Sequence, residues 1–323
     1  MGNLKKWIGW AVLLIALVLY PRIFGIYYTN VFVTFAIFAL FAVTLNLLLG
    51  YTGLLTFGHA MFFGTGGYAT AIALERIEGL PIIAAVLIGF LAAIVLALIL
   101  CPIVVRVSGT AFAMLHLAFG QLMYVLALKL RFITGGEDGV GGFDIPPLGF
   151  PGIGSVDISD PLNFYYFAVT VLGLSIWFLW FFTKTPLGSV MVGIRDNANR
   201  VNYLGFKVTQ TKAVIYTLAG AFAGVAGSVY ALFQNLIAAD DAYNVWVSFA
   251  PIMMTMVGGI SSFFGPIAGA AIFGIIEELT SRYTERVELV MGLILISIIM
   301  FAPLGFVGFV NFLKQKLIRR SAR

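Results

Sequence analysis

Long apolar segments recur along the whole chain, and they constrain its fold more than any other feature of the sequence. An α-helix needs about 20 residues to cross the roughly 30 Å hydrocarbon core of a bilayer, and most of these segments approach that length. Only 10% of the 323 residues are charged, whereas a soluble domain has about a quarter. We therefore expect an all-α polytopic membrane protein of one domain, 1–323, with about ten transmembrane or partly re-entrant helices. The candidate segments lie near 7–24, 28–50, 54–75, 81–105, 110–131, 162–183, 213–235, 245–260, 264–281 and 287–309.

Two parts of this prediction stay open. The segments 245–260 and 264–281 are short and rich in glycine. They fit either two full spans or broken, re-entrant helices, which membranes tolerate only where protein or a cavity covers the backbone. The segment that follows Lys5 and Lys6 imitates a secretory signal, but no small-residue cleavage site follows Tyr20, so we expect a retained first helix.

Charge patterning predicts the orientation of the helices. Loops on the cytoplasmic side of a membrane protein carry an excess of Lys and Arg, and an N-terminus placed inside puts most of the basic residues inside as well. Both termini are then cytoplasmic, with a cytoplasmic loop at 184–212, an external loop at 132–161 and a basic cytoplasmic tail at 310–323. The net charge of +5 reflects this bias toward anionic lipid, not nucleic acid.

The sequence offers no chemistry of its own. It contains no phosphate-binding loop, no metal-ligand spacing and no Ser/His/Asp set on predicted loops, so we expect no catalytic residue, no bound metal and no enzyme. Ion-driven carriers commonly hold carboxylates deep in the membrane, and here the acidic residues fall at predicted loops or helix ends. The energy for transport is therefore expected from a partner.

The histidines and small residues of the apolar segments are the candidates for a solute pathway. His59 and His116 each lie alone in an apolar segment, and an intramembrane histidine is a functional candidate because its burial is costly. We assign His116 to packing. The pathway candidates are Gly58, His59, Gly64, Thr65, Gln121, Gly259 and Gly265.

Small residues at four-residue spacing have a plainer interpretation, because they let helices approach closely in lipid. The interpretation applies to Gly220, Gly224 and Ser228, to Gly265 with Gly269, and to Ala270 with Gly274.

The predicted cytoplasmic loop has the pattern of a docking element. Residues 193–212 predict a short helix, with Asp196 or Asn197 accepting hydrogen bonds from the first backbone N–H groups and Gly205 ending it in a left-handed conformation. Such a helix can dock a soluble cytoplasmic protein. The alternative is a solvated loop whose basic residues only fix the topology.

Five segments together resemble the permease subunits of ABC importers for branched-chain amino acids, and specifically the longer of the two permeases. They are NLLLGYTGLLTFGHAMFFGTGGY (46–68), SGTAFAMLHLAFGQLMY (108–124), TGGEDGVGG (134–142), RDNANRVNYLGF (195–206) and GGISSFFGPIAGAAIFGIIEEL (258–279).

The resemblance implies a function and a set of partners. It implies a bacterial or archaeal inner-membrane permease that pairs with a related, shorter permease, two cytoplasmic ATPases that use the ATP, and an external solute-binding protein; the chain itself would bind lipid but no cofactor. It also implies that the ATPase-coupling residues are Arg195, Asp196, Asn197, Arg200, Leu204 and Gly205. The order Arg195-Asp196-Asn197-Ala198 departs from the acidic pattern usual after this arginine, which leaves individual docking contacts open. Related permeases serve urea or short amides, and an ion-coupled carrier or channel remains the other alternative.

Overall fold

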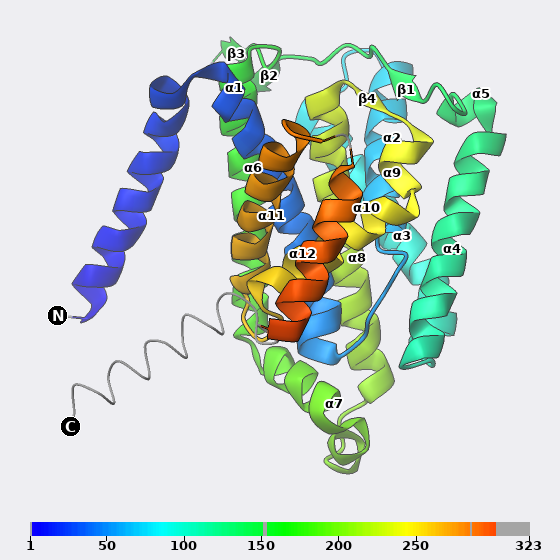
Figure 1. The fold of residues 1–323 in the computed structure, drawn as a ribbon. Helices are drawn as coiled ribbons and strands as arrows, with labels where there is room; N and C mark the ends of the chain where they lie inside the picture. The colour runs from blue at the N-terminus through cyan, green and yellow to red at the C-terminus, as the bar shows by residue number, and fades with distance from the viewer. Residues whose placement is uncertain (1, 151–153, 285, 302–323) are drawn as a thin grey trace.

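Helices that run back and forth along one axis make up most of the molecule, as the computed structural model in Figure 1 shows. The structure describes residues 2–150, 154–284 and 286–301, so the predicted basic tail at 310–323 lies outside the described residues. The longer helices are α1 (Gly2–Thr52), α2 (Ala60–Arg76), α3 (Ile82–Val104), α4 (Thr110–Lys129), α6 (Pro161–Thr183), α7 (Pro186–Tyr203), α8 (Val208–Gln234), α10 (Val245–Gly258), α11 (Gly265–Ser281) and α12 (Val287–Phe301). Two short helices, α5 (Arg131–Thr134) and α9 (Ala239–Tyr243), complete the set.

Glycine divides α1 into two helical stretches. Gly25 has φ 76° and ψ 174°, a backbone conformation that residues other than glycine rarely adopt. The chain turns there. In Figure 1 the stretch before Gly25 runs apart from the bundle, and the stretch after it enters the bundle. The predicted division between segments 7–24 and 28–50 is therefore present.

Within the part of the chain that the structure describes, five helical stretches are long and apolar enough to cross a membrane: Leu17–Thr52, Ile82–Val104, Thr110–Lys129, Pro161–Thr183 and Val208–Gln234. The helices α2, α10, α11 and α12 are shorter; the 14 residues of α10 extend only about 21 Å. α10 and α11 are separate helices joined by a turn at Gly259. The count of about ten spans stays a prediction.

Four short strands, which the all-α prediction did not include, lie at the end of the bundle opposite α7 (Figure 1). β1 (Val140–Gly141) pairs antiparallel with β4 (Leu236–Ile237), and β2 (Leu148–Phe150) pairs antiparallel with β3 (Gly154–Val156). The Gly-rich loop at 132–161 leaves backbone N–H and C=O groups without helical partners, and strand pairing satisfies some of them.

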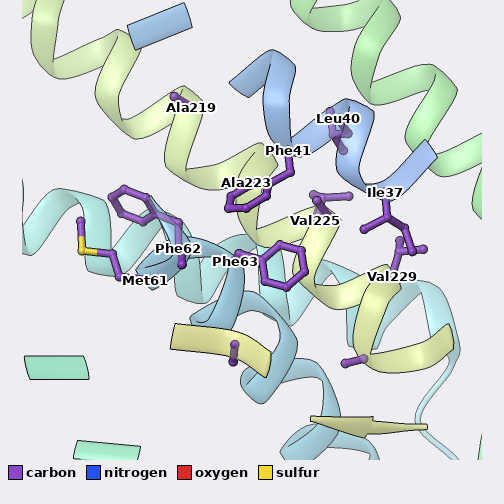
Figure 2. Packing of buried hydrophobic residues seen from close by; sticks show 14 of the residues in the cluster. Ile37, Leu40, Phe41, Met61, Phe62, Phe63, Ala219, Ala223, Val225 and Val229 are labelled. Atoms are coloured by element: carbon purple, nitrogen blue, oxygen red, sulfur yellow. The ribbon is translucent and has the colours of Figure 1, made fainter. Parts of the chain in front are cut away.

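The core lies where α1, α2 and α8 meet. Figure 2 shows Phe41 of α1 and Phe63 of α2 converging beside Ala223 and Val225 of α8, whereas the Phe62 ring points the other way and packs against Gly220.

Close approach in this core depends on glycine. A Cβ on Gly66 would lie 2.1 Å from the carbonyl oxygen of Gly224, and a Cβ on Gly224 would lie 2.4 Å from Cβ of Ala93. The packing interpretation of the Gly220, Gly224 and Ser228 spacing is thus confirmed. It is also confirmed for Gly269, whose Cβ would lie 1.7 Å from the carbonyl oxygen of Met254. A Cβ on Gly274 would meet nothing within 4 Å among the described residues, so its packing role stays a prediction.

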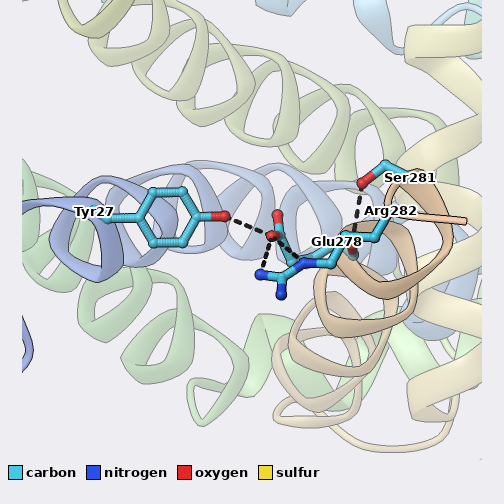
Figure 3. A network of polar contacts seen from close by, with 4 residues as sticks. All are labelled: Tyr27, Glu278, Ser281 and Arg282. Atoms are coloured by element: carbon cyan, nitrogen blue, oxygen red, sulfur yellow. Dashed lines mark hydrogen bonds and ion pairs between the residues drawn. The ribbon is translucent and has the colours of Figure 1, made fainter.

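A polar network ties the start of the second stretch of α1 to the end of α11. Tyr27 donates a hydrogen bond to the Glu278 carboxylate, which also pairs with Arg282 at 2.8 Å (Figure 3). This network adds a polar contact to the hydrophobic packing of the α10–α11 hairpin against α1.

Candidate functional site

The helix α7 changes direction at Asn197, within the segment predicted to dock a partner. Asn197 has the extended conformation φ −162°, ψ 98°, and its Oδ1 accepts a hydrogen bond from the backbone N–H of Arg200 at 3.0 Å. A side-chain oxygen in this arrangement caps the N-terminus of a new helical stretch. The predicted cap is therefore Asn197, whereas Asp196 pairs with its neighbour Arg195 at 3.3 Å.

Gly205 ends this second stretch as predicted. It has φ 89°, its N–H bonds to the carbonyl of Asn202, and the N–H of Phe206 bonds to the carbonyl of Val201. This pair of bonds is the Schellman motif, which satisfies carbonyls left free at a helix end. The chain between Asn197 and Gly205 is thus a short helix with a defined start and a defined stop.

Large side chains project from the tip of this short helix. Tyr203 is 88% exposed and Leu204 is 70% exposed, and Phe206 is also exposed. Of these only Leu204 was among the predicted coupling residues. The proximity of Tyr203 and Phe206 to the Gly205 terminator is the sequence signal that could have identified them.

Arg195 points toward the bundle. Its Nη1 donates a hydrogen bond of 2.7 Å to the carbonyl oxygen of Gly50, in the last turn of α1. Gly53, which has φ 71° and ends α1, leaves room for the Arg195 side chain, because a Cβ there would lie 3.2 Å from Cγ of Arg195. A cation at the C-terminus of a helix also interacts favourably with the helix dipole, so Arg195 anchors α7 to the end of α1.

From that end, residues 53–59 lead without regular structure to His59, directly before α2. His59 is fully buried, stacks on Phe41, and its Nε2 lies 3.0 Å from the hydroxyl of Thr44. Because Thr44 is eight residues before the end of α1, His59 lies about 12 Å inside the bundle.

The tautomer of His59 follows from its neighbour. The Thr44 hydroxyl donates its single hydrogen to the carbonyl of Phe41 at 2.7 Å, so it accepts from Nε2 of His59. In the neutral ring Nδ1 is then an acceptor, and it is buried without a hydrogen-bond partner among the described residues.

Two helix N-termini meet beside His59. The backbone N–H of Ala60, which starts α2, donates to the hydroxyl of Ser248 in the first turns of α10 at 3.0 Å. Phe57 stacks on Phe249 in the same place. The positive dipole ends of α2 and α10 therefore converge inside the bundle, as they do at transporter sites built from interrupted helices.

The predicted pathway residues fall into two groups. Gly58, His59, Gly64 and Thr65 come together at this junction: a Cβ on Gly58 would lie 1.9 Å from the carbonyl oxygen of His116, and one on Gly64 would lie 2.5 Å from the Tyr243 ring. The Thr65 hydroxyl lies 3.3 Å from that of Tyr243. The half-buried Gln121 follows Gly120 on α4, which packs against Gly58.

Gly259 and Gly265 do not join the junction. They lie in the turn between α10 and α11 and pack against each other, since a Cβ on Gly265 would lie 2.1 Å from the carbonyl oxygen of Gly259. His116 is a packed residue, as expected: it bonds to the Phe112 carbonyl and to the Tyr216 hydroxyl at 3.1 Å. Among the described residues no group of three or more His, Cys, Asp or Glu is placed to hold a metal.

Comparison with known proteins gives one consistent result. A family model described as "Branched-chain amino acid transport system / permease component" matches residues 27–302. The chain is 26% identical to the high-affinity branched-chain amino acid transport system permease protein LivM of Salmonella typhimurium, over 83% of this chain and 67% of the relative. It is 25% identical to the probable LivM permease of Methanocaldococcus jannaschii, over 80% of this chain and 83% of the relative. It is also 25% identical to the LivH permease of Escherichia coli K12, over 84% of this chain and 91% of the relative. No solved structure matches the chain.

Proposed function

Because this chain belongs to the branched-chain amino acid transport permease family, we propose that it is the longer permease subunit of an ABC importer. It carries branched-chain or related hydrophobic amino acids into the cytoplasm, and separate subunits hydrolyse the ATP. The match over residues 27–302 supports the permease role for the whole helical bundle. The chain is similar both to LivM and to LivH permeases, which supports a pair of related permeases as the transport unit.

The proposed topology has about ten spans in a bacterial or archaeal cytoplasmic membrane, with both termini inside. α7 and the 184–212 loop lie in the cytoplasm, and the 132–161 loop with its short strands lies outside. The helices α2 and α10 are too short to cross alone, but segment 53–59 extends α2 and α9 extends α10. Irregular backbone of this kind is tolerated in a membrane where protein covers it.

The single observation that carries the coupling role is the path from α7 into the bundle. Tyr203, Leu204 and Phe206 offer a surface for an ATPase subunit, and Arg195 fixes the base of the same helix to Gly50. A displacement of α7 is thereby passed to the end of α1 and along residues 53–59 to the junction at His59. We assign the junction of α2 with α10 to the part of the bundle that changes shape during transport.

Reconstitution tests the proposal. The chain is assembled with its partner permease, both ATPases and the binding protein in liposomes, and uptake of radiolabelled leucine is measured with and without internal ATP. ATP-dependent uptake is expected only from the complete complex. Uptake by the chain alone would support an ion-coupled carrier or channel instead, and ATP-driven uptake of urea or short amides without leucine would change the substrate class.

A further inference from the structure

Two exposed carboxylates lie beside α2, below the end of that helix. Asp240 and Asp241 belong to α9, which packs beside α2 and α4 (Figure 1). The hydrogen-bond contact of Tyr243 with Thr65 sets the depth of α9, because Thr65 is eleven residues, or about 16 Å, before the end of α2. One turn of helix back from Tyr243, the two carboxylates lie roughly 10 Å inside that end.

Tyrosines surround this pair of carboxylates. Tyr124 of α4 donates a hydrogen bond to Asp240 at 2.8 Å. Tyr68 of α2 stacks on Tyr243, which lies in α9 two residues after Asp241. The Tyr68 hydroxyl is enclosed, in a residue only 4% exposed, and it has no hydrogen-bond partner among the described residues.

Among the described residues, no ion pair joins Asp240 or Asp241 to a cation. The ion pairs of the described residues are Arg195 with Asp196 and Arg282 with Glu278, and neither involves α9. A charged side chain at membrane depth is costly unless it is paired or faces a water-filled cavity, and such residues mark substrate or ion pathways. Asp240 and Asp241 are both exposed on the chain's own surface, so they face such a pathway or a neighbouring subunit.

We propose that Asp240 and Asp241, with Tyr68 and Tyr124, form a binding site for the ammonium group of the transported amino acid in the external half of the pathway. An ammonium group has three N–H donors and no acceptor, which matches two carboxylates and a free tyrosine hydroxyl. The positively charged group also sits favourably beside aromatic rings. The inference rests on the proposed function, and it separates amino acids, which bring an ammonium group, from urea and amides, which do not.

The first test uses the complete importer in liposomes with saturating, leucine-loaded binding protein. The double variant Asp240→Asn with Asp241→Asn keeps the side-chain shape and removes the charge, and we expect its leucine uptake to fall at least about ten-fold, the factor that corresponds to losing one modest charged contact. The exposed external Asp144→Asn makes the same kind of substitution outside the site, with the loss of one charge, and should keep the wild-type rate. The single variant Asp241→Glu keeps a carboxylate at this position and should retain most of the uptake.

A second readout separates binding from folding. Isopentylammonium, which has the leucine side chain and the ammonium group but no carboxylate, should inhibit leucine uptake by the wild-type complex, and the neutral isopentanol should not. Residual uptake by Asp241→Asn should resist isopentylammonium. The site would be overturned, with the importer intact, by a double variant that transports like wild type. Equal inhibition of the wild-type and Asp241→Asn complexes by isopentylammonium would overturn it as well. A wild-type complex that takes up no amino acid would instead overturn the proposed function and this site with it.

Discussion

Arg195 on α7 and Gly50 on α1, 145 residues apart in the chain, are joined by a 2.7 Å hydrogen bond from the guanidinium Nη1 to the carbonyl oxygen. Gly50 lies in the last turn of α1, where carbonyls have no partner within the helix. The bond therefore does two things at once: it satisfies a free carbonyl and fixes the base of the exposed α7 tip to the bundle. A force applied to that tip has a direct route to α1.

Arg195→Gln should weaken the coupling of ATP hydrolysis to transport. A hydrogen bond to a charged group contributes about 1.5 to 3 kcal/mol, so its loss should lower leucine uptake per ATP hydrolysed by roughly ten-fold. Both quantities are measured in liposomes that contain the complete importer. Arg106→Gln, at an exposed position beyond the end of α3 on the same face, is the matched control. Equal coupling ratios in the two variants would remove Arg195 from the coupling path.

Tyr203→Ser should reduce the binding of the ATPase subunits. The side chain is 88% exposed beside the helix terminator, and aromatic residues are enriched at protein interfaces. Recovery of the ATPases with affinity-tagged permease is the measurement. Tyr283 offers a close control, because it is also 88% exposed and follows α11, which ends at the opposite end of the bundle from α7 (Figure 1). If Tyr203→Ser and Tyr283→Ser retain the ATPases equally, the α7 tip is not the docking surface.

Gly205→Ala should loosen the short helix after Asn197. Gly205 has φ 89°, and a left-handed conformation costs a residue with a Cβ roughly 1 to 2 kcal/mol. We expect faster tryptic cleavage within residues 195–207 and lower uptake, with unchanged membrane insertion. Gly173→Ala in α6 is the control, since its Cβ would meet open space in a helical conformation. Cleavage rates that match between the two variants would show that Gly205 does not limit the helix end.

The sequence predicted the features that depend on local chemistry. Apolar length predicted most helix bounds within a few residues, although α2 begins at Ala60 and not at 54. The cap at Asn197 and the stop at Gly205 follow from residues that act on their own backbone. The separation at Gly25 follows for the same reason, because a polar or glycine interruption is visible in the sequence itself.

The features that depend on distant partners were not predictable. Nothing near Arg195 in the sequence indicates that it bonds to Gly50. Asp240 and Asp241 look like loop residues, since α9 is only five residues long, and its inward position depends on how Tyr243 packs against α2. The strands β1 and β4 were missed because they pair across nearly a hundred residues and each contains only two residues.

Gly58→Ala should destabilise the contact between α4 and segment 53–59, which precedes α2. Its Cβ would lie 1.9 Å from the His116 carbonyl oxygen, whereas a Cβ on Gly120 would lie 3.3 Å from Cα of Gly58 and one on Gly274 would meet nothing within 4 Å. Overpacking a tight contact costs about 1 to 3 kcal/mol. Thermal unfolding in detergent should therefore rank the alanine variants, with Gly58→Ala least stable, Gly120→Ala intermediate and Gly274→Ala like wild type. A different order would mean that the backbones can separate without cost.

His59→Leu should lower uptake more than it lowers stability. The ring is held by the Thr44 hydroxyl at Nε2, and its other nitrogen, Nδ1, is a buried acceptor without a partner among the described residues, beside the convergent N-termini of α2 and α10. If opening of the junction exposes Nδ1 to the solute, the His59→Leu side chain removes that contact while it fills most of the volume of the imidazole ring. Thr44→Val is the control, because it removes the anchor of the ring and leaves Nδ1 in place. Leucine uptake per assembled complex and thermal unfolding are measured for both variants. Uptake at the wild-type rate in His59→Leu would return His59 to packing, and an equal loss of stability in the two variants would identify the Thr44 bond as its main role.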